Sequence, residues 1–297
     1  MASAAFEKLR KVLKPGLAVP SDPPELVREK MHRVHPTHVP EDASVEHATL
    51  GGVPAAWIST RDVGDSRLVV LHVHGGAFVS TGIEHYVPYA STIGRAARGR
   101  VVVFAYRLAP EHRFPAALDD TLAVYRALIS EGVAPERIAI TGDSCGGGIG
   151  LALLLRLREA GLPLPAAYVG FTPWFDLEMR GDSALAPQGV DPYVDPEWIR
   201  ARGRDYVGPD GDVRDPLASP IHADLSGLPP MLLQVGQVDI TRDDSTRLAA
   251  RAARDGVAVT LEAWPEMIHG FHGLAELIPE GREALARAGE FVRRYLD

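Results

Sequence analysis

A serine flanked by glycines has the residue types and spacing of an activated nucleophile. The segment Gly142-Asp143-Ser144-Cys145-Gly146 fits the pattern G-x-S-x-G, follows a short apolar run and opens the helical pattern GGGIGLALLLRLREA. A nucleophile elbow needs this context, because its tight turn admits only small residues two before and two after the serine. We therefore predict Ser144 as the nucleophile, on an elbow formed with Gly142, Asp143 and Gly146, rather than as an ordinary helix cap or part of a phosphate loop.

A second glycine-containing loop could supply backbone N–H groups for an oxyanion. Residues 72–78 read His-Val-His-Gly-Gly-Ala-Phe and directly follow a predicted strand. Such N–H groups stabilise the negative charge that develops during attack on a carbonyl, by about 3–4 kcal/mol each. We expect an oxyanion hole in the loop of Gly75, Gly76 and Ala77, with the last two as the main donors and the N–H of Cys145 as a third.

Asp239 and His269 have the order and placement of the two partners that a serine nucleophile needs. The base takes the proton of the serine, and an acidic residue orients the base. Behind an elbow of this type, the acid and then the histidine follow the serine along the chain, each just after a strand. Asp239 follows the apolar run 230–236 and His269 follows the run 257–264. The sequence thus predicts the catalytic triad Ser144, His269 and Asp239.

Other residues compete for these two roles. His272 is the alternative base, although His269 lies nearer to the end of its strand. Asp243 and Asp244 are alternative acids, but they fall in the following helix, where we expect them to face solvent or to cap its first turn. Asp215, a third alternative, belongs to an Asp-Pro loop far from the expected position.

The histidines of the chain raise the question of a metal site, and we expect none. His72 and His74 share a strand face, but no third group of ligands accompanies them, which favours a structural or hydrogen-bonded role. His32, His35 and His38 lie close together in the sequence, but a proline among them breaks any common helix face. The sequence therefore predicts no metal site.

Strands and helices alternate from about residue 45 onward. This alternation indicates βαβ units and a mostly parallel sheet, with strands covered on both faces. Strands are predicted from the apolar runs 53–60, 67–73, 100–106, 137–141, 166–172, 230–236 and 257–264. Helices are predicted near 84–98, 115–131, 145–160, 241–255 and 280–296.

Two segments fall outside this alternation. Residues 1–45 predict short amphipathic helices interrupted by prolines, and residues 176–216 are rich in Pro and Asp around one short helical patch. We expect both to form a helical cap over a catalytic domain made of residues 46–175 and 217–297. A surface excursion without function is the alternative for 176–216. Four aromatic residues in or next to this segment are expected either to line an apolar pocket or to pack in the core: Trp174, Tyr193, Trp198 and Tyr206.

The composition narrows the class of protein. The 297 residues carry a formal net charge of −8 and show no basic stripe, which argues against a nucleic-acid partner. The single cysteine excludes an internal disulfide and is consistent with a reducing compartment. Charged residues interrupt the first apolar residues, and no run of 18 apolar residues occurs, so we expect neither a secretory signal nor a membrane span. A cytoplasmic protein is predicted.

Several longer motifs resemble those of the bacterial hormone-sensitive-lipase-like esterases, a branch of the α/β-hydrolases. The resemblance spans most of residues 70–275. It rests on HGGAF (74–78), YRLAPEHRFPAALDD (106–120), GDSCGGG (142–148), DPLASP (215–220), VDITRDDS (238–245) and MIHGF (267–271).

This resemblance implies an α/β-hydrolase fold with an eight-stranded sheet and a helical cap. It also implies a serine carboxylesterase that hydrolyses short-to-medium acyl esters without a cofactor, and a possible homodimer. Ser144, His269 and Asp239 take the triad positions of the family, and Gly76, Ala77 and Cys145 take those of the oxyanion hole.

Two residues depart from the family pattern. Ala77 replaces a third glycine but still offers its N–H group. Cys145 stands where the family usually has alanine, and its side chain narrows the space beside the nucleophile. We favour an inert, buried thiol over one that makes the protein sensitive to thiol reagents.

Alternative functions share this fold. A lactonase, amidase or peptidase would use the same triad, whereas a non-catalytic ligand-binding protein would not need His269. An epoxide hydrolase or dehalogenase would carry Asp at the position of Ser144. A small-molecule ester is therefore the expected partner, with a lactone as the main alternative.

Overall fold

A mixed eight-stranded sheet forms the centre of the part of the chain that the structure, a computed structural model, describes: residues 2–13, 19–63, 66–185 and 191–296. The strand order is β1-β2-β4-β3-β5-β6-β7-β8. β2 pairs antiparallel with β1 and β4, and the other neighbours are parallel. The strands are β1 (Ala43–Leu50), β2 (Val53–Thr60), β3 (Val69–Val73), β4 (Arg100–Phe104), β5 (Ile138–Asp143), β6 (Ala167–Phe171), β7 (Met231–Gly236) and β8 (Val259–Trp264).

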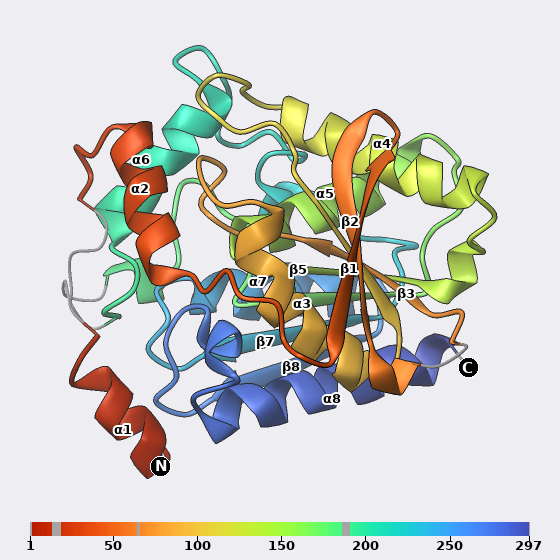
Figure 1. The fold of residues 1–297 in the computed structure, drawn as a ribbon. Coiled ribbons are helices and arrows are strands. Elements are labelled where there is room, and N and C mark those ends of the chain that lie inside the picture. The colour runs from red at the N-terminus through yellow and green to blue at the C-terminus, as the bar shows by residue number, and fades with distance from the viewer. Residues whose placement is uncertain (1, 14–18, 64–65, 186–190, 297) are drawn as a thin grey trace.

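Helices cover both faces of this sheet. α3 and α8 share one apolar core with the strands, and α4, α5 and α7 share the other (Figure 1). None of the helices in the described part of the chain has the length and apolar character that a membrane crossing requires. The helices are α1 (Ala4–Arg10), α2 (Pro24–Val34), α3 (Ile83–Ala97), α4 (Ala116–Ser130), α5 (Cys145–Glu159), α6 (Pro196–Val207), α7 (Arg242–Arg254) and α8 (Pro279–Leu296).

The predicted α/β-hydrolase fold is confirmed. Of its eight strands, β1 is the one that the apolar runs of the sequence did not predict. The seven predicted runs correspond to β2 through β8, and the five helical patterns to α3, α4, α5, α7 and α8. β1 is an edge strand with exposed Ser44, Glu46 and His47, so it contains no continuous apolar run. It joins β2 through Gly51 and Gly52, whose φ values of 60° and 84° suit a tight hairpin turn.

The carboxyl ends of the parallel strands meet at one edge of the sheet. Loops that leave β3, β5, β7 and β8 there carry, in turn, the glycine loop, the elbow, Asp239 and His269. Residues far apart in the sequence are thus placed together by the parallel register, as is usual for sites in open α/β sheets.

The helices outside the alternation fall into two groups. α2 and α6 lie side by side (Figure 1), and Arg202 of α6 donates a hydrogen bond of 3.0 Å to the carbonyl of Asp22 just before α2. We refer to α2 and α6 as the cap helices. α1 lies apart from them, and its buried Phe6 packs against Trp264 and Phe271 at the β8–α8 end of the molecule.

Candidate active site

The turn between β5 and α5 holds Ser144 in a strained backbone conformation. Its φ of 52° and ψ of −126° lie outside the regions that serine ordinarily adopts. A Cβ at Gly142 would lie 2.4 Å from the carbonyl oxygen of Gly146, and one at Gly146 would lie 2.1 Å from that of Val73. Both glycines are therefore required by space, as predicted for an elbow.

Ser144, His269 and Asp239 form one chain of hydrogen bonds. His269 Nε2 lies 2.9 Å from Ser144 Oγ, and His269 Nδ1 lies 3.0 Å from Asp239 Oδ1. The imidazole and the carboxylate are buried. Burial alone would lower the pKa of His269, but the charge and hydrogen bond of Asp239 outweigh it, and the pKa lies above its ordinary value. The arrangement favours a base that holds a proton once it has taken it from the serine.

The carboxylate of Asp239 is itself held in place by Thr241. The backbone N–H and the hydroxyl of Thr241 both donate to Asp239 Oδ1, at 2.8 and 2.9 Å. These contacts fix the oxygen that faces His269 and so fix the ring as well. The sequence analysis missed Thr241, although its place two residues after the acid is typical of a side chain that folds back on a turn.

His272 has a different role from His269. Its Nε2 lies 3.1 Å from Oε1 of Gln234. The amide nitrogen of Gln234 in turn donates to Glu262 and to the carbonyl of Ala284. Burial lowers the pKa of His272 to about 3, so the ring is neutral. His272 is 1 % exposed and lines the same pocket, but it makes no hydrogen bond to Ser144 among those of the described residues.

The alternative acids point elsewhere. Asp243 accepts a hydrogen bond from the N–H of Ser183, and Asp215 accepts one from Leu217 in its own loop. The expectation that Asp244 faces solvent or caps its helix is wrong. It is 2 % exposed, because its carboxylate accepts the N–H groups of residues 175 and 176 at the start of the insertion.

The glycine loop after β3 faces the same pocket as Ser144. Gly76 and Ala77 line this pocket and have positive φ values of 106° and 54°. A turn of this kind directs successive N–H groups into one concave surface. The N–H of Cys145 is the first of α5, where helical N–H groups have no partner within the helix. The structure thus brings Gly76 and Ala77 to the pocket of Ser144, and the oxyanion hole stays a prediction.

Gly75 is the exception in the predicted oxyanion hole. Its N–H donates to Tyr86 Oη at 2.8 Å and to Asp143 Oδ1 at 3.0 Å, so it is already engaged. Its N–H group is therefore not free for an oxyanion, so Gly75 positions the loop instead of belonging to the oxyanion hole. The elbow residue Asp143 also accepts a 2.8 Å hydrogen bond from Tyr86, and it lies 3.2 Å from His72 Nε2. Burial would raise the pKa of Asp143, but His72 and Tyr86 keep it below its ordinary value.

His72 and His74 both have protein partners. His72 Nδ1 lies 2.8 Å from Thr141 Oγ1, and His74 Nδ1 lies 2.8 Å from the carbonyl of Gly75. Burial lowers the pKa of His74 to about 4, so this ring is neutral and stacks on Tyr106 at 4.0 Å between centroids. His74 thus contacts the glycine loop directly, whereas His72 contacts the elbow residue Asp143.

A second carboxylate, Asp191, contacts the base from the other side. Its Oδ2 accepts the backbone N–H of His269 at 2.7 Å, and its Oδ1 accepts the N–H of Tyr193 at 2.8 Å. Burial, followed by repulsion from Asp239, raises the pKa of Asp191 to about 6. The sequence analysis missed this residue, because nothing in the insertion 176–216 marks one aspartate among several.

The pocket above Ser144 is mainly apolar. The cap helices contribute Met31, Trp198 and Ile199, and Tyr193 precedes α6. Of the four aromatic residues predicted for a pocket or the core, Tyr193 and Trp198 line this pocket. Trp174 and Tyr206 pack in the core around Phe78, which stacks on Tyr206 at 3.7 Å between centroids.

Cys145 lies behind the nucleophile and away from solvent. Its side chain is 0 % exposed, and its Sγ accepts the N–H of Phe78 at 3.2 Å. Burial raises the pKa of the thiol to about 12. The group is therefore protonated and has the properties of a small buried hydrophobe.

Known proteins resemble this chain in sequence and in structure. A family with the α/β hydrolase fold matches residues 70–273. An acetyl-hydrolase of Streptomyces hygroscopicus is 40% identical over 245 residues, which are 82% of this chain and 81% of that protein. An esterase of Acinetobacter venetianus is 34% identical over 75% of this chain and 74% of its own length.

Solved structures agree with these relatives. EstE5, in a crystal soaked with p-nitrophenyl butyrate, superimposes with a TM-score of 0.93 at 37% identity over 99% of both chains. An esterase from the bacterial hormone-sensitive lipase family does so with a TM-score of 0.92 at 38% identity over all of both chains. With its elbow, glycine loop and strand order, the chain belongs to the α/β-hydrolase fold family, in the branch of the bacterial hormone-sensitive-lipase-like esterases.

Proposed function

We propose that the protein is a serine carboxylesterase that acts on short-to-medium acyl esters. The observation that carries this proposal is the continuous chain of hydrogen bonds from Ser144 Oγ through His269 to Asp239, with distances of 2.9 and 3.0 Å. Nucleophile, base and orienting acid at such distances are the arrangement that acyl transfer requires.

Hydrolysis then proceeds in two steps. Ser144 Oγ attacks the ester carbonyl while His269 Nε2 takes its proton, and Asp239 stabilises the imidazolium that forms. The N–H groups of Gly76, Ala77 and Cys145 stabilise the oxyanion. His269 returns the proton to the leaving alcohol, and a water molecule activated by the same ring releases the acid from the acyl-enzyme.

The pocket supports the substrate class. Its lining by Met31, Trp198 and Ile199 favours an apolar acyl group next to Ser144. We also propose that the cap helices, with the segment around Tyr193, cover the substrate during turnover, and that residues 46–175 and 217–297 form the catalytic domain. EstE5, whose crystal was soaked with p-nitrophenyl butyrate, provides a related protein with such a substrate.

A series of p-nitrophenyl esters with increasing acyl length tests the proposal. We expect turnover by the wild type, fastest on short chains, and a loss of about 10⁴-fold or more in Ser144→Ala. Circular dichroism should show that the variant is folded. Activity that survives in Ser144→Ala would contradict the assignment of the nucleophile. A folded wild type without turnover on any ester would favour a lactone substrate, tested next, or a ligand-binding function.

A further inference from the structure

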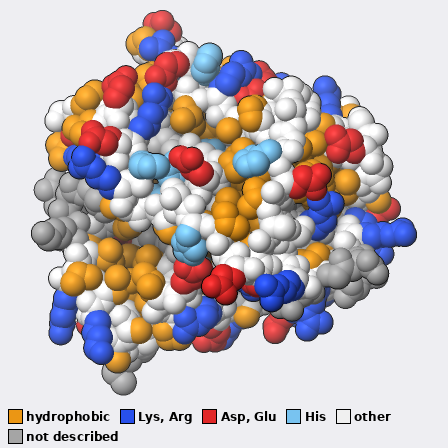
Figure 2. All heavy atoms as spheres, viewed as in Figure 1, with side chains coloured by type: hydrophobic (Ala, Val, Ile, Leu, Met, Phe, Trp, Pro, Cys, Tyr) orange, Lys and Arg blue, Asp and Glu red, His pale blue; other side chains and the backbone are white. Residues whose placement is uncertain are grey.

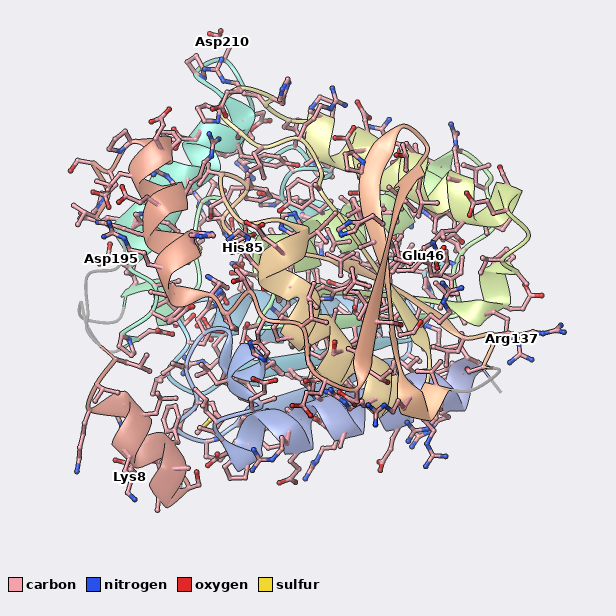
Figure 3. All side chains as sticks on the ribbon, viewed as in Figure 1. Lys8, Glu46, His85, Arg137, Asp195 and Asp210 are labelled. Carbon is pink, nitrogen blue, oxygen red and sulfur yellow. The ribbon has the colours of Figure 1, made fainter. Side chains whose placement is uncertain are left out.

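Three metal-ligating side chains meet at the rim of the pocket. His32 lies in the last turn of α2, and Glu84 and His85 lie in the first turn of α3. Figure 2 shows histidine and acidic side chains next to one another on this face, and Figure 3 labels His85 at the start of α3 next to α2. His85 also lines the pocket that contains Ser144.

The three donor atoms have the spacing of a metal site. His32 Nδ1 lies 3.0 Å from His85 Nε2, and Glu84 Oε1 lies 3.7 Å from the first and 3.6 Å from the second. A triangle with these sides has a central point about 2.0 Å from every corner, which matches the lengths of Zn–N and Zn–O bonds. One ion close to that point would lie within bonding distance of all three ligand atoms.

We propose that His32, Glu84 and His85 bind one divalent transition-metal ion of the zinc class. Two imidazoles and one carboxylate form a ligand set that zinc accepts, and the exposed side of His32 and Glu84, 61% and 65% exposed, leaves a fourth position for water. Magnesium and calcium fit less well, because they prefer oxygen ligands.

The two facing imidazole nitrogens are already paired with each other, so a change of tautomer must precede metal binding. At 3.0 Å, His32 Nδ1 and His85 Nε2 share one hydrogen bond, so one of the two nitrogens carries the proton. Burial lowers the pKa of His85, which keeps its ring neutral. With a proton of His32 on its Nε2 and one of His85 on its Nδ1, both facing nitrogens offer lone pairs to an ion.

A second group of possible metal ligands in the described residues differs from this one in the charge around it. Asp176, Glu178 and His222 also lie close together. However, Arg247 lies 2.6 Å from Asp176, and Arg180 lies 3.4 Å from Glu178, so positive charge is already present there. No arginine or lysine forms an ion pair with Glu84 among the ion pairs of the described residues, where its partners are His32 and His85.

Such an ion would join a cap helix to the catalytic domain beside the pocket. His32 belongs to α2, whose Met31 and Val34 line the pocket, whereas Glu84 and His85 belong to α3. A bound ion holds the last turn of α2 against α3 and opposes any movement of this helix that admits substrate. We therefore expect zinc to slow turnover reversibly. This consequence rests on the proposed esterase activity, whereas binding itself does not.

Calorimetric titration of zinc into the tag-free, chelator-treated protein tests the site. We expect one ion per chain and a loss of affinity of about tenfold or more in His32→Asn and in Glu84→Gln. His47→Asn, which changes an exposed histidine on β1, is the matched control and should bind like the wild type. Failure to bind zinc, or equal binding by the wild type and His32→Asn, would overturn the proposal.

Activity provides the second measurement. Zinc should inhibit the wild type, a chelator should restore the rate, and His32→Asn should keep its basal activity but lose the inhibition. Inhibition that persists in His32→Asn would overturn the link between this site and turnover and would indicate zinc at His269 instead. If the protein hydrolyses no ester, the titration still decides whether the site binds metal, so the two proposals fail separately.

Discussion

The sheet edge and the cap segments contribute to the same pocket in different ways. At the sheet edge, Ser144, Asp239 and His269 follow the parallel strands β5, β7 and β8. Hydrogen bonds link the three side chains to one another, and Thr241 holds Asp239. The cap side contributes mainly apolar side chains and one carboxylate, Asp191, from segments with no strand to fix them. On the proposed function, we therefore expect the sheet edge to determine the chemistry and the cap segments to influence selectivity and the response to pH.

Asp239→Asn removes the orienting carboxylate at the sheet edge. Of the variants at Asp239, Asp191, Trp198 and Cys145, it should lower kcat/KM most. An amide keeps the shape of the side chain but cannot stabilise the imidazolium or hold the required tautomer, so kcat/KM should fall by about 10³- to 10⁴-fold. The acyl-length preference should not change, because the pocket lining is untouched. The measurement is kcat/KM on acetyl, butyryl and octanoyl esters.

Asp243→Asn is the matched control for this variant. Asp243 lies four residues away and accepts a backbone N–H from the insertion, without contact to His269 among the described hydrogen bonds. Equal losses in the two variants would show that the acid had been assigned wrongly.

Asp191→Asn tests the carboxylate from the cap side, with a smaller expected effect. Its negative charge helps to raise the pKa of His269, so its removal lowers that pKa. Because the reaction needs neutral His269, the acid limb of the kcat/KM profile should move to lower pH. On the plateau, the imidazolium loses some stabilisation, and the rate should fall by about fivefold, equivalent to about 1 kcal/mol.

The pH profile separates this role from a structural one. A variant that merely loosens the loop would lower the rate without moving the acid limb. Asp195→Asn changes the aspartate that accepts the N–H groups of Glu197 and Trp198 at the start of α6, and it should leave the profile in place. A shift of the acid limb to higher pH in Asp191→Asn would contradict the proposed charge interaction.

The two regions also differ in how far the sequence predicted them. The elbow, Asp239 and His269 could be placed because each follows an apolar strand, and parallel strands end at one edge. Asp191 could not, because its contact to His269 spans 78 positions and depends on how the insertion folds back. The spacing of His32, His35 and His38 indicates only whether they share one helix face, whereas His32 meets His85 from another helix. Local patterns do not record such contacts.

Trp198→Leu tests the cap as a determinant of acyl length. Trp198 is 2 % exposed and lines the pocket, so a smaller side chain enlarges the space for the acyl group. We expect the ratio of kcat/KM for octanoyl over acetyl esters to rise by about three- to tenfold, the effect of one or two buried methylene groups. Trp57→Leu, on β2 and outside the pocket, should leave this ratio unchanged. An unchanged ratio in Trp198→Leu would remove α6 from the acyl site.

Cys145→Ala should have the smallest effect on activity, although the side chain lies beside the nucleophile. Burial raises the pKa of the thiol to about 12, so it takes no part as a thiolate, and the N–H proposed for the oxyanion hole is kept. The variant should retain kcat/KM within about threefold, and iodoacetamide should not inactivate the wild type. Stability should fall by about 1–2 kcal/mol, because the N–H of Phe78 loses its sulfur acceptor. If Cys145→Ala instead loses most of its activity under reducing conditions while it remains folded, the sulfur takes part in positioning Ser144 or the glycine loop. The sheet edge would then depend on a side chain that the chemistry of the triad does not require.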